Sequence, residues 1–438
     1  MKIRELRGAS VAGEVSALRL PESVNREVAA AVTGLVDDVR ERGDAAVVEA
    51  TARFDWENAN LSTLVVAAGE LEAAYRDVDP RVIDALETAR ENCTFFHKHE
   101  LRPDWEDEGA QGQRLGVRHL PVERAGLYVP GGLGSYASTV VMNAVPARVA
   151  GVKELVICTP PGRDGTVNPS VFAAARLMGI ERVFRAGGAQ AIAAMAYGTE
   201  TIPRVDVISG PGNAYVMEAK RQVYGSVGID SLAGPSEVLV VADRTARPEW
   251  IAADMLAQEE HGAGAQAVLV AESEGLCVQV GEALLRLRLA TDAGGTEGRP
   301  AGQENGDLRA FYPAPGEEFL DLAARFVNSY APEHLEIQLT KAEAFLPRVG
   351  SAGAVFIGHL TPTAFGDYVA GSNHVLPTGG TARFASPLSV DTFIRRFSFV
   401  RMNAEAVTAL TPHLAELADS EGFSFHRMSA ELRTGEAD

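Results

Sequence analysis

Short apolar runs, rich in β-branched residues, alternate with helix-length segments from about residue 118 to residue 357. They fall into two sets: 126–129, 155–158, 182–184 and 205–208, then 238–242, 267–270, 334–339 and 354–357. Continuous apolar runs with this spacing are typical of parallel strands that helices cover on both faces. The sequence therefore predicts an α/β protein with two Rossmann-like lobes and a crossover near residues 234–236.

Both ends of the chain have a different pattern. Residues 23–100 have apolar positions at helical spacing, and they predict a helical N-terminal region. After about residue 385, amphipathic sequence predicts a helix over 404–418 that is broken or restarted at Pro412. This tail is too small to bury a core alone, so we expect it to pack on the rest of the chain or on a partner subunit. The polar, Gly-rich segment 291–306 predicts an exposed loop without a chemical role.

Charge and cysteine content exclude several classes of protein. A formal net charge of −19 argues against a nucleic-acid partner, because neutralising phosphates requires clustered Lys and Arg. Three widely separated cysteines, Cys93, Cys158 and Cys277, exclude a disulfide framework and a Cys-x-x-Cys metal site. The sequence has no signal-peptide run and no stretch of roughly 20 apolar residues that could span a bilayer. We expect a cytoplasmic protein that does not contact a membrane.

Three Gly-rich turns follow strands of the first set. The turn at 132–137 matches the G-x-G-x-x-A dinucleotide pattern, but the next strand ends in Cys158-Thr-Pro160 rather than in the acidic residue that binds ribose. The other two turns are 186–190 and 209–213. Ligands bind at the carboxyl ends of parallel strands, so the three turns together favour a nucleotide site, although each alone also suits a plain tight turn.

Three segments carry side chains that could bind a metal. Gln258 and His261 are three apart and share a helix face, a Gly-punctuated loop carries Asp367, Asn373 and His374, and the tail carries Glu421 and His426. Imidazole and carboxylate ligands without thiolates suit Zn²⁺ or Mn²⁺. A Gln/His pair by itself is more often a feature of an exposed helix surface.

The adjacent pair Glu333 and His334 follows a predicted helix over 319–330 that Pro332 stops. Neighbouring side chains in a strand point to opposite faces, so both can address one site only if the chain bends there. Histidine can act as a general base near neutral pH, and a carboxylate beside it can orient it or activate water. The alternative is a solvated turn.

Several of these segments together resemble histidinol dehydrogenase over nearly the whole chain. The matching stretches are Gly126-Leu-Tyr-Val-Pro-Gly-Gly132, Gly187-Gly-Ala-Gln-Ala-Ile192, Gly210-Pro-Gly-Asn213, Ala233-Gly-Pro-Ser-Glu-Val238, Gln258-Glu-Glu-His-Gly262, Ala331-Pro-Glu-His-Leu335 and Asn373-His-Val-Leu-Pro-Thr378. The resemblance implies oxidation of L-histidinol to L-histidine through L-histidinal, in the final steps of L-histidine biosynthesis. It also implies reduction of two NAD⁺ and one Zn²⁺ per site.

The resemblance also assigns roles to individual residues. His334 would accept the alcohol proton, and Glu333 would activate the water that attacks the aldehyde. The implied zinc ligands are Gln258, His261, Asp367 and His426. The implied lining of the substrate pocket is Ser236, Gln258, His261, His334, Asp367, His374, Glu421 and His426. The implied NAD contacts are Tyr128, Gln190 and Asn213.

On this basis we expect four regions in the chain. Residues 1–22 would be an N-terminal segment, 23–122 with 236–380 the lobe of the metal and catalytic residues, and 123–235 the NAD lobe. Residues 381–438 would be a tail exchanged in a homodimer, because in the family the tail ligand comes from the neighbouring subunit.

Three other functions remain open from the sequence. A relative could oxidise a different alcohol with the same zinc and NAD machinery, although Glu421 and His374 favour histidinol. A zinc hydrolase could use Glu333 as its base, but it would leave Tyr128, Gln190 and Asn213 without a role. A non-enzymatic metal-binding module would need neither Glu333 nor His334.

Overall fold

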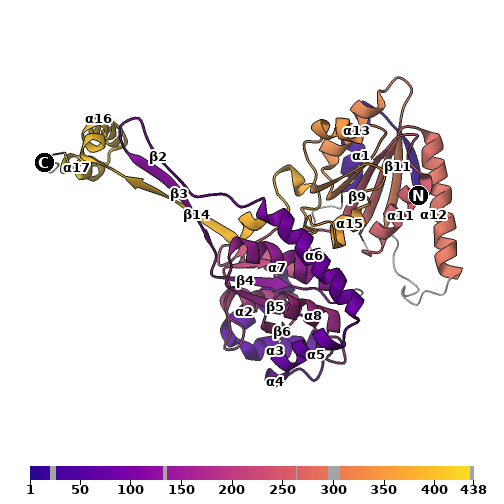
Figure 1. Ribbon diagram of the computed structural model, residues 1–438, viewed down its shortest axis with the longest axis horizontal. Coiled ribbons are helices and arrows are strands. Elements are labelled where there is room, and N and C mark those ends of the chain that lie inside the picture. The colour runs from indigo at the N-terminus through magenta and orange to yellow at the C-terminus, as the bar shows by residue number, and fades with distance from the viewer. Residues whose placement is uncertain (20–25, 132–135, 263, 294–305, 435–438) are drawn as a thin grey trace. The chain divides into compact units, whose positions relative to one another are not determined.

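The structure, a computed structural model, describes residues 1–19, 26–131, 136–262, 264–293 and 306–434 (Figure 1). Residues 132–135 of the first Gly-rich turn and most of segment 291–306 lie outside these ranges, and so do the predictions made for them. The chain divides into two compact units, residues 1–99 with 123–393 and residues 100–122 with 394–438. We describe each unit by itself.

One lobe of the first unit is built on a six-stranded parallel sheet, in the order β1-β11-β10-β9-β12-β13. Its strands are β1 (Lys2–Leu6), β9 (Glu237–Ala242), β10 (Gln266–Ala271), β11 (Asp307–Pro313), β12 (His334–Gln338) and β13 (Ala354–Ile357). Helices α1 (Val11–Leu18) and α13 (Phe319–Tyr330) cover one face (Figure 1). Helices α11 (Pro248–Glu259) and α12 (Glu274–Ala293) cover the other. Because both faces are covered, the internal strands β9 and β10 are apolar after their first residues, Glu237 and Gln266.

The other lobe is built on a five-stranded parallel sheet, in the order β6-β5-β4-β7-β8. Its strands are β4 (Arg124–Tyr128), β5 (Glu154–Thr159), β6 (Arg182–Arg185), β7 (Val207–Ser209) and β8 (Gly228–Ile229). The helices between them are α7 (Ala137–Ala150), α8 (Pro169–Leu177), α9 (Gly188–Tyr197) and α10 (Ala214–Val223). All eight apolar runs of the sequence form strands, which confirms the predicted α/β class with parallel sheets.

The N-terminal helices pack on this second lobe. They are α2 (Arg26–Arg42), α3 (Asp44–Phe54), α4 (Leu61–Leu64), α5 (Ala68–Asp77) and α6 (Pro80–Lys98). Helix α2 contacts α9 and α10, α5 contacts α8, and α6 contacts α7. From the sequence, residues 23–122 were expected in one lobe with 236–380, and residues 1–22 as a separate segment. Instead, helices α2 to α6 pack on the lobe of the five-stranded sheet, and β1 is a strand of the six-stranded sheet. Helical periodicity shows which side chains face inward but not which sheet they cover.

The second unit joins two distant parts of the chain. Strands β2 (Trp105–Glu108), β3 (Arg114–Pro121) and β14 (Ile394–Arg401) form an antiparallel sheet in the order β14-β3-β2. Two helices follow, α16 (Ala404–Glu421) and α17 (Ser424–Glu431). The tail is therefore combined with residues 100–122 rather than forming a region of its own over 381–438.

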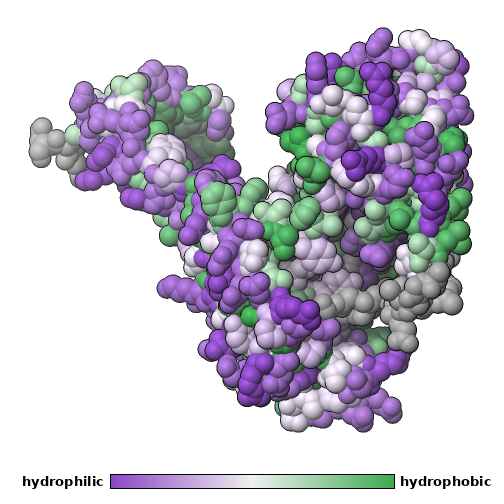
Figure 2. Space-filling model, turned by 45° about the vertical axis from the view of Figure 1, so that its right-hand side comes forward, coloured by the Kyte–Doolittle hydropathy of each residue, from purple (hydrophilic) through white to green (hydrophobic). Residues whose placement is uncertain are grey.

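Helix α16 runs through Pro412, contrary to the predicted break. Pro412 is exposed and lacks the N–H that would donate to the Thr408 carbonyl, and its ring crowds that carbonyl, which typically costs a helix about 3 kcal/mol; α16 nevertheless continues to Glu421. Helix α17 buries no residue, and apolar side chains such as Val400, Leu417 and Phe425 are exposed within the unit. Figure 2 shows green, hydrophobic surface on this unit at its upper left. Packing of this tail on a partner subunit stays a prediction.

The remaining elements are short. They are α14 (Ala342–Phe345), α15 (Thr363–Tyr368) and the 3₁₀ turns η1 (Gly8–Ser10), η2 (Leu346–Arg348), η3 (Thr381–Arg383) and η4 (Val390–Phe393). Within the described ranges, no helix combines the length and the apolar character that a bilayer crossing requires.

Candidate active site

The chain bends sharply between α13 and β12. Ala331 ends α13 in the left-handed region with φ of 47°, Pro332 follows, and β12 begins at His334. Glu333 and His334 are both buried, which excludes the solvated turn that the sequence left open. Their side chains lie 3.6 Å apart, between Glu333 Oε2 and His334 Nδ1.

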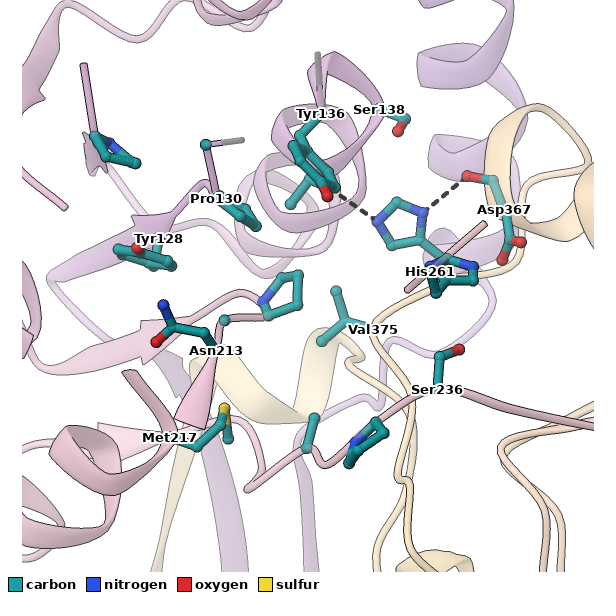
Figure 3. A pocket seen from close by; sticks show the side chains of 18 of the residues that line it. Tyr128, Pro130, Tyr136, Ser138, Asn213, Met217, Ser236, His261, Asp367 and Val375 are labelled. Carbon is teal, nitrogen blue, oxygen red and sulfur yellow. Dashed lines mark hydrogen bonds between the residues drawn. The ribbon is translucent and has the colours of Figure 1, made fainter. Parts of the chain in front are cut away.

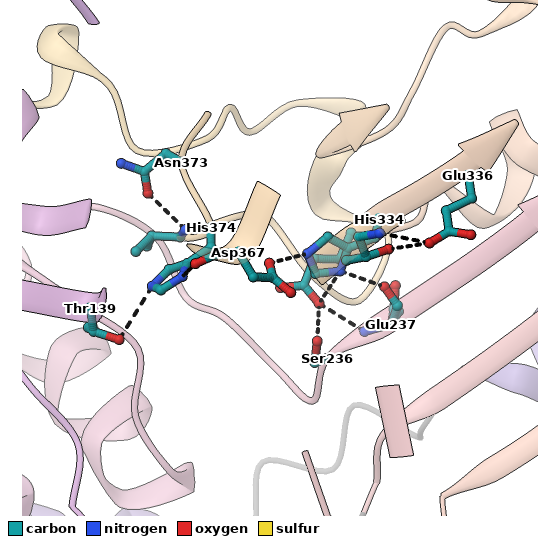
Figure 4. Close-up of polar contacts among 11 residues, drawn as sticks. Thr139, Ser236, Glu237, His334, Glu336, Asp367, Asn373 and His374 are labelled. Carbon is teal, nitrogen blue, oxygen red and sulfur yellow. Dashed lines mark hydrogen bonds and ion pairs between the residues drawn. The ribbon is translucent and has the colours of Figure 1, made fainter. Parts of the chain in front are cut away.

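Hydrogen bonds from the neighbouring strand hold this pair (Figure 4). Glu333 Oε2 accepts hydrogen bonds from Ser236 Oγ at 2.6 Å and from the Glu237 backbone N–H at 2.8 Å. His334 Nδ1 lies 3.1 Å from the Glu237 carbonyl oxygen. A carbonyl only accepts, so Nδ1 carries a hydrogen, and Nε2 is the atom left for chemistry.

His334 Nε2 faces Asp367, whose Oδ1 is 3.3 Å away. Burial alone lowers the pKa of His334, but the charges of Glu333 and Asp367 outweigh it and raise the pKa to about 9. For Asp367, burial alone raises the pKa, but the contact with His334 and the nearby rings of His374 and His261 bring it below its usual value. Asp367 is therefore an ionised carboxylate among three imidazoles.

His374 joins the two lobes at this point. Its Nδ1 lies 2.8 Å from the Asp367 carbonyl oxygen, and its Nε2 lies 3.3 Å from Thr139 Oγ1 on α7 (Figure 4). The first contact requires Nδ1 to donate, so Nε2 accepts from Thr139 when the ring is neutral. Burial lowers the pKa of His374, which favours that neutral ring.

Gln258 and His261 reach the same region from the end of α11. Gln258 is buried, and its Nε2 has no hydrogen-bond partner among the described residues, whereas His261 is exposed beside Asp367 (Figure 3). A buried amide without a partner, an ionised carboxylate and an imidazole together suit a zinc ion, because an amide can present its oxygen after a flip. In the described ranges, no three His, Cys, Asp or Glu side chains form a metal-binding group, so such a site needs the Gln258 amide.

The three residues implied for NAD lie at the carboxyl ends of β4, β6 and β7. Tyr128 Oη accepts from the Gly188 N–H at 3.1 Å, and Asn213 Oδ1 caps α10 by accepting from the N–H groups of Tyr215 and Val216. Gln190 Nε2 lies 3.4 Å from Asp55 Oδ2. Burial raises the pKa of Asp55 to about 6.

These residues share one cleft with Glu333 and His334. Tyr128 and Asn213 lie on one side of it, and Ser236, His261 and Asp367 lie on the other (Figure 3). Of the residues predicted from the sequence, the cleft brings together Tyr128, Gln190, Asn213, Ser236, Gln258, His261, Glu333, His334, Asp367 and His374. Glu421 and His426 are exposed side chains of the second unit, on α16 and α17.

A family model described as histidinol dehydrogenase matches residues 18–434. The chain belongs to the histidinol dehydrogenase family. It is 48% identical over 416 residues to the histidinol dehydrogenase of a Synechococcus strain, covering 94% of this chain and 92% of that one. The Geobacter sulfurreducens histidinol dehydrogenase is 45% identical over 436 residues, covering 99% and 100% of the two chains.

A solved structure agrees with this membership. The crystal structure of the Elizabethkingia anophelis histidinol dehydrogenase matches with a TM-score of 0.89 at 33% identity, covering 99% of this chain and 98% of that one. The α/β architecture described above is thus the histidinol dehydrogenase fold.

The sequence did not point to Asp55, Thr139 or Glu237, which also contact site residues. Asp55 follows α3, more than 100 residues before Gln190, and no motif marks it. Thr139 lies in the largely apolar helix α7, where a single Thr is unremarkable in sequence. Glu237 adjoins Ser236 in a matching stretch. Its backbone contacts both Glu333 and His334, and its carboxyl contacts the Glu333 backbone.

Proposed function

We propose that this member of the histidinol dehydrogenase family is a zinc-dependent enzyme that oxidises L-histidinol through L-histidinal to L-histidine, reducing two NAD⁺. The observation that carries the proposal is the arrangement around Asp367. An ionised carboxylate, three imidazoles and the buried Glu333 line one side of a cleft, and strand-end turns suited to a dinucleotide line the other.

The substrate would bind on the side of the cleft that carries Asp367. A zinc ion held by Gln258, His261, Asp367 and His426 of the partner subunit would act as a Lewis acid and anchor the imidazole and amine of histidinol. Ser236, His334, His374 and Glu421 would complete the pocket. Tyr128, Gln190 and Asn213 would hold NAD⁺ so that its nicotinamide faces the alcohol carbon.

In the first oxidation, His334 Nε2 would accept the hydroxyl proton as hydride leaves the carbon for NAD⁺. The hydrogen bond from Nδ1 to the Glu237 carbonyl fixes the ring so that Nε2 faces the cleft. A base must be neutral, whereas Glu333 and Asp367 favour the charged ring. A cation neutralising Asp367 would remove one of these two charges, and so would favour neutral His334.

In the second oxidation, Glu333 would take a proton from water as the water oxygen attacks the aldehyde carbon. The resulting adduct, a geminal diol that lacks one proton, loses hydride to a second NAD⁺ and its hydroxyl proton to His334, giving the carboxylate. Ser236 and the Glu237 N–H hold the Glu333 carboxylate in place for this step.

The experiment that tests the proposal is NADH production from L-histidinol by the purified protein, before and after zinc chelation. We expect chelation to abolish NADH production and added Zn²⁺ to restore it. No NADH under zinc-replete conditions would overturn the proposal, and NADH production that survives complete removal of zinc would overturn its metal dependence.

A further inference from the structure

Strand β12 carries two buried polar side chains beyond the catalytic pair. The sequence His334-Leu-Glu-Ile-Gln338 alternates apolar and polar residues, a pattern that usually turns polar side chains to water. Here the strand is internal to the sheet, and Glu336 is 0% and Gln338 2% exposed. Buried carboxyl and amide groups are costly unless they are hydrogen-bonded, so their partners show what they do.

Glu336 bonds to the start of helix α15. Its Oε1 accepts hydrogen bonds from the Thr363 backbone N–H at 2.9 Å and from Thr363 Oγ1 at 2.7 Å. These two bonds cap the first turn of α15, and a carboxylate is favourable there because helix N-termini carry unpaired N–H groups.

Glu336 is also linked to helix α11, through Gln338 and Asp254. Gln338 Nε2 donates to Glu336 Oε2 at 3.0 Å and to Asp254 Oδ2 at 3.1 Å. The Asp254 carboxyl contacts Glu336 directly, and burial together with this neighbour raises the pKa of Asp254. Asp254 therefore keeps its proton and can donate to Glu336, so two acids lie together without two charges.

Three residues of this hydrogen-bond network each lie on the same strand or helix as a proposed site residue, two or four positions away in sequence. Glu336 is two residues after His334 and shares its strand face. Asp254 is four residues before Gln258 on α11. Thr363 is four residues before Asp367 on α15. Four residues make about one helical turn, so fixing Asp254 and Thr363 fixes the faces that present Gln258 and Asp367.

We propose that Glu336 is a positioning residue that sets the separation of the zinc ligands Gln258 and Asp367 by tying α11 and α15 to the strand of His334. This inference rests on the zinc site of the proposed function. Metal–ligand distances tolerate about 0.2 Å, so two ligands on separate helices require such a tie. Loss of groups that orient metal ligands typically weakens metal binding by about 10–100-fold.

The test is zinc affinity, measured by chelator competition on the full-length protein and its variants. Glu336→Ala removes the tie to both helices, and we expect zinc to bind about 10–100-fold more weakly. Glu336→Gln keeps an oxygen for Thr363 but replaces the oxygen that accepts from Gln338 with a donor, so it should restore only part of the affinity. Thr363→Val keeps the backbone bond but loses the hydroxyl bond, so a smaller, several-fold loss is expected.

Asp243→Ala is the matched control. Asp243 Oδ2 accepts from the Thr340 N–H at 2.7 Å and from Thr340 Oγ1 at 2.8 Å, the same pair of donor groups, but it joins the ends of β9 and β12 rather than α11 and α15. We expect its zinc affinity to match that of the unmodified protein. Equal losses in Asp243→Ala and Glu336→Ala would overturn the inference, because they would indicate a general structural effect.

The remaining outcomes separate the inference from the proposed function. Unmodified protein without bound zinc would overturn the zinc site itself. Zinc bound equally well by unmodified protein and Glu336→Ala would overturn the inference alone. If Glu336→Ala does not fold, Thr363→Val decides, and an unchanged zinc affinity in that folded variant would overturn the inference.

Discussion

Glu333 and His334 are neighbours in sequence, but the structure gives them different partners. Glu333 accepts hydrogen bonds from Ser236 and the Glu237 N–H, and His334 faces Asp367. The substitution Glu333→Gln keeps an oxygen that can accept the same hydrogen bonds. It removes the basic carboxylate together with the charge that raises the pKa of His334, so it tests the proposed proton-accepting role of Glu333 and leaves a more readily neutral His334 as base.

We predict that Glu333→Gln slows oxidation of L-histidinal about 10²–10⁴-fold, the usual contribution of a general base, and slows oxidation of L-histidinol much less. NADH formation measured separately from each substrate checks this. Equal losses in both steps would contradict the division of roles between Glu333 and His334.

Asp55 gives a prediction about pH and stability. Burial raises its pKa in the folded protein from 3.8 to about 6, so the folded state holds this proton more tightly than the unfolded chain does. Stability should therefore fall as pH rises through this window, and the full penalty should be present above about pH 6.

Asp55→Asn removes this penalty while keeping an oxygen that can face Gln190. We expect the variant to gain on the order of 1 kcal/mol over the unmodified protein at pH 7.5, and nothing at pH 4. Urea unfolding at the two pH values measures the difference. A gain that does not change with pH would show that ionisation of Asp55 is not its cause.

At the scale of elements, the turn after β7 depends on one glycine. Gly210 has φ of +117°, and a Cβ added there would lie 2.0 Å from the Tyr128 carbonyl oxygen, at the end of β4. A side chain would thus push apart two turns that are proposed to contact NAD. Gly225 has a similar φ of +101°, but nothing lies within 4 Å of an added Cβ.

We predict that Gly210→Ala weakens NAD⁺ binding at least about 10-fold and destabilises the fold, whereas Gly225→Ala costs only about 1 kcal/mol of stability from its left-handed backbone. Titration of NADH fluorescence and unfolding curves compare the two. The steric argument fails if both variants bind NADH equally well.

The individual strands show which parts of the fold could be predicted from the sequence. Most of the eight predicted strands are internal or helix-covered and hence have apolar runs, which is the pattern that identifies them. Strand β1 was missed because it is an edge strand with exposed charged residues, and β11 because Arg309 interrupts its apolar run. Glu336 shows the opposite failure, since its alternating strand is fully buried.

The sequence predicted those residues of the candidate site that lie in family motifs or beside a bend of the chain. Pro332 predicted that Glu333 and His334 share one site, and the left-handed Ala331 shows how the chain turns there. Asp55, Thr139 and Asp254 could not be predicted from the sequence, because each contacts its hydrogen-bond partner only after segments far apart in the chain have packed together. Pairing of segments far apart in the chain is the information that periodicity lacks.

At the scale of the whole molecule, Glu421 and His426 lie in a unit that combines the tail with residues 100–122. The homodimer with shared sites therefore remains a prediction, and subunit complementation can test it. Asp367→Asn and His426→Asn should each be inactive alone. After mixing and subunit exchange, half of the dimers are heterodimers with one intact site, so about one quarter of the activity should return.

Activity that does not return after verified subunit exchange would contradict a site shared between subunits. A single variant, Asp367→Asn mixed with itself, serves as the control for slow reactivation.

The central claim, a four-electron oxidation in one site, is tested most directly by stoichiometry. Limiting L-histidinol is incubated with the zinc-loaded protein and excess NAD⁺, and NADH and L-histidine are quantified at completion. The account predicts two NADH and one L-histidine for each L-histidinol consumed. One NADH per L-histidinol with L-histidinal accumulating, or no NADH at all, would contradict it.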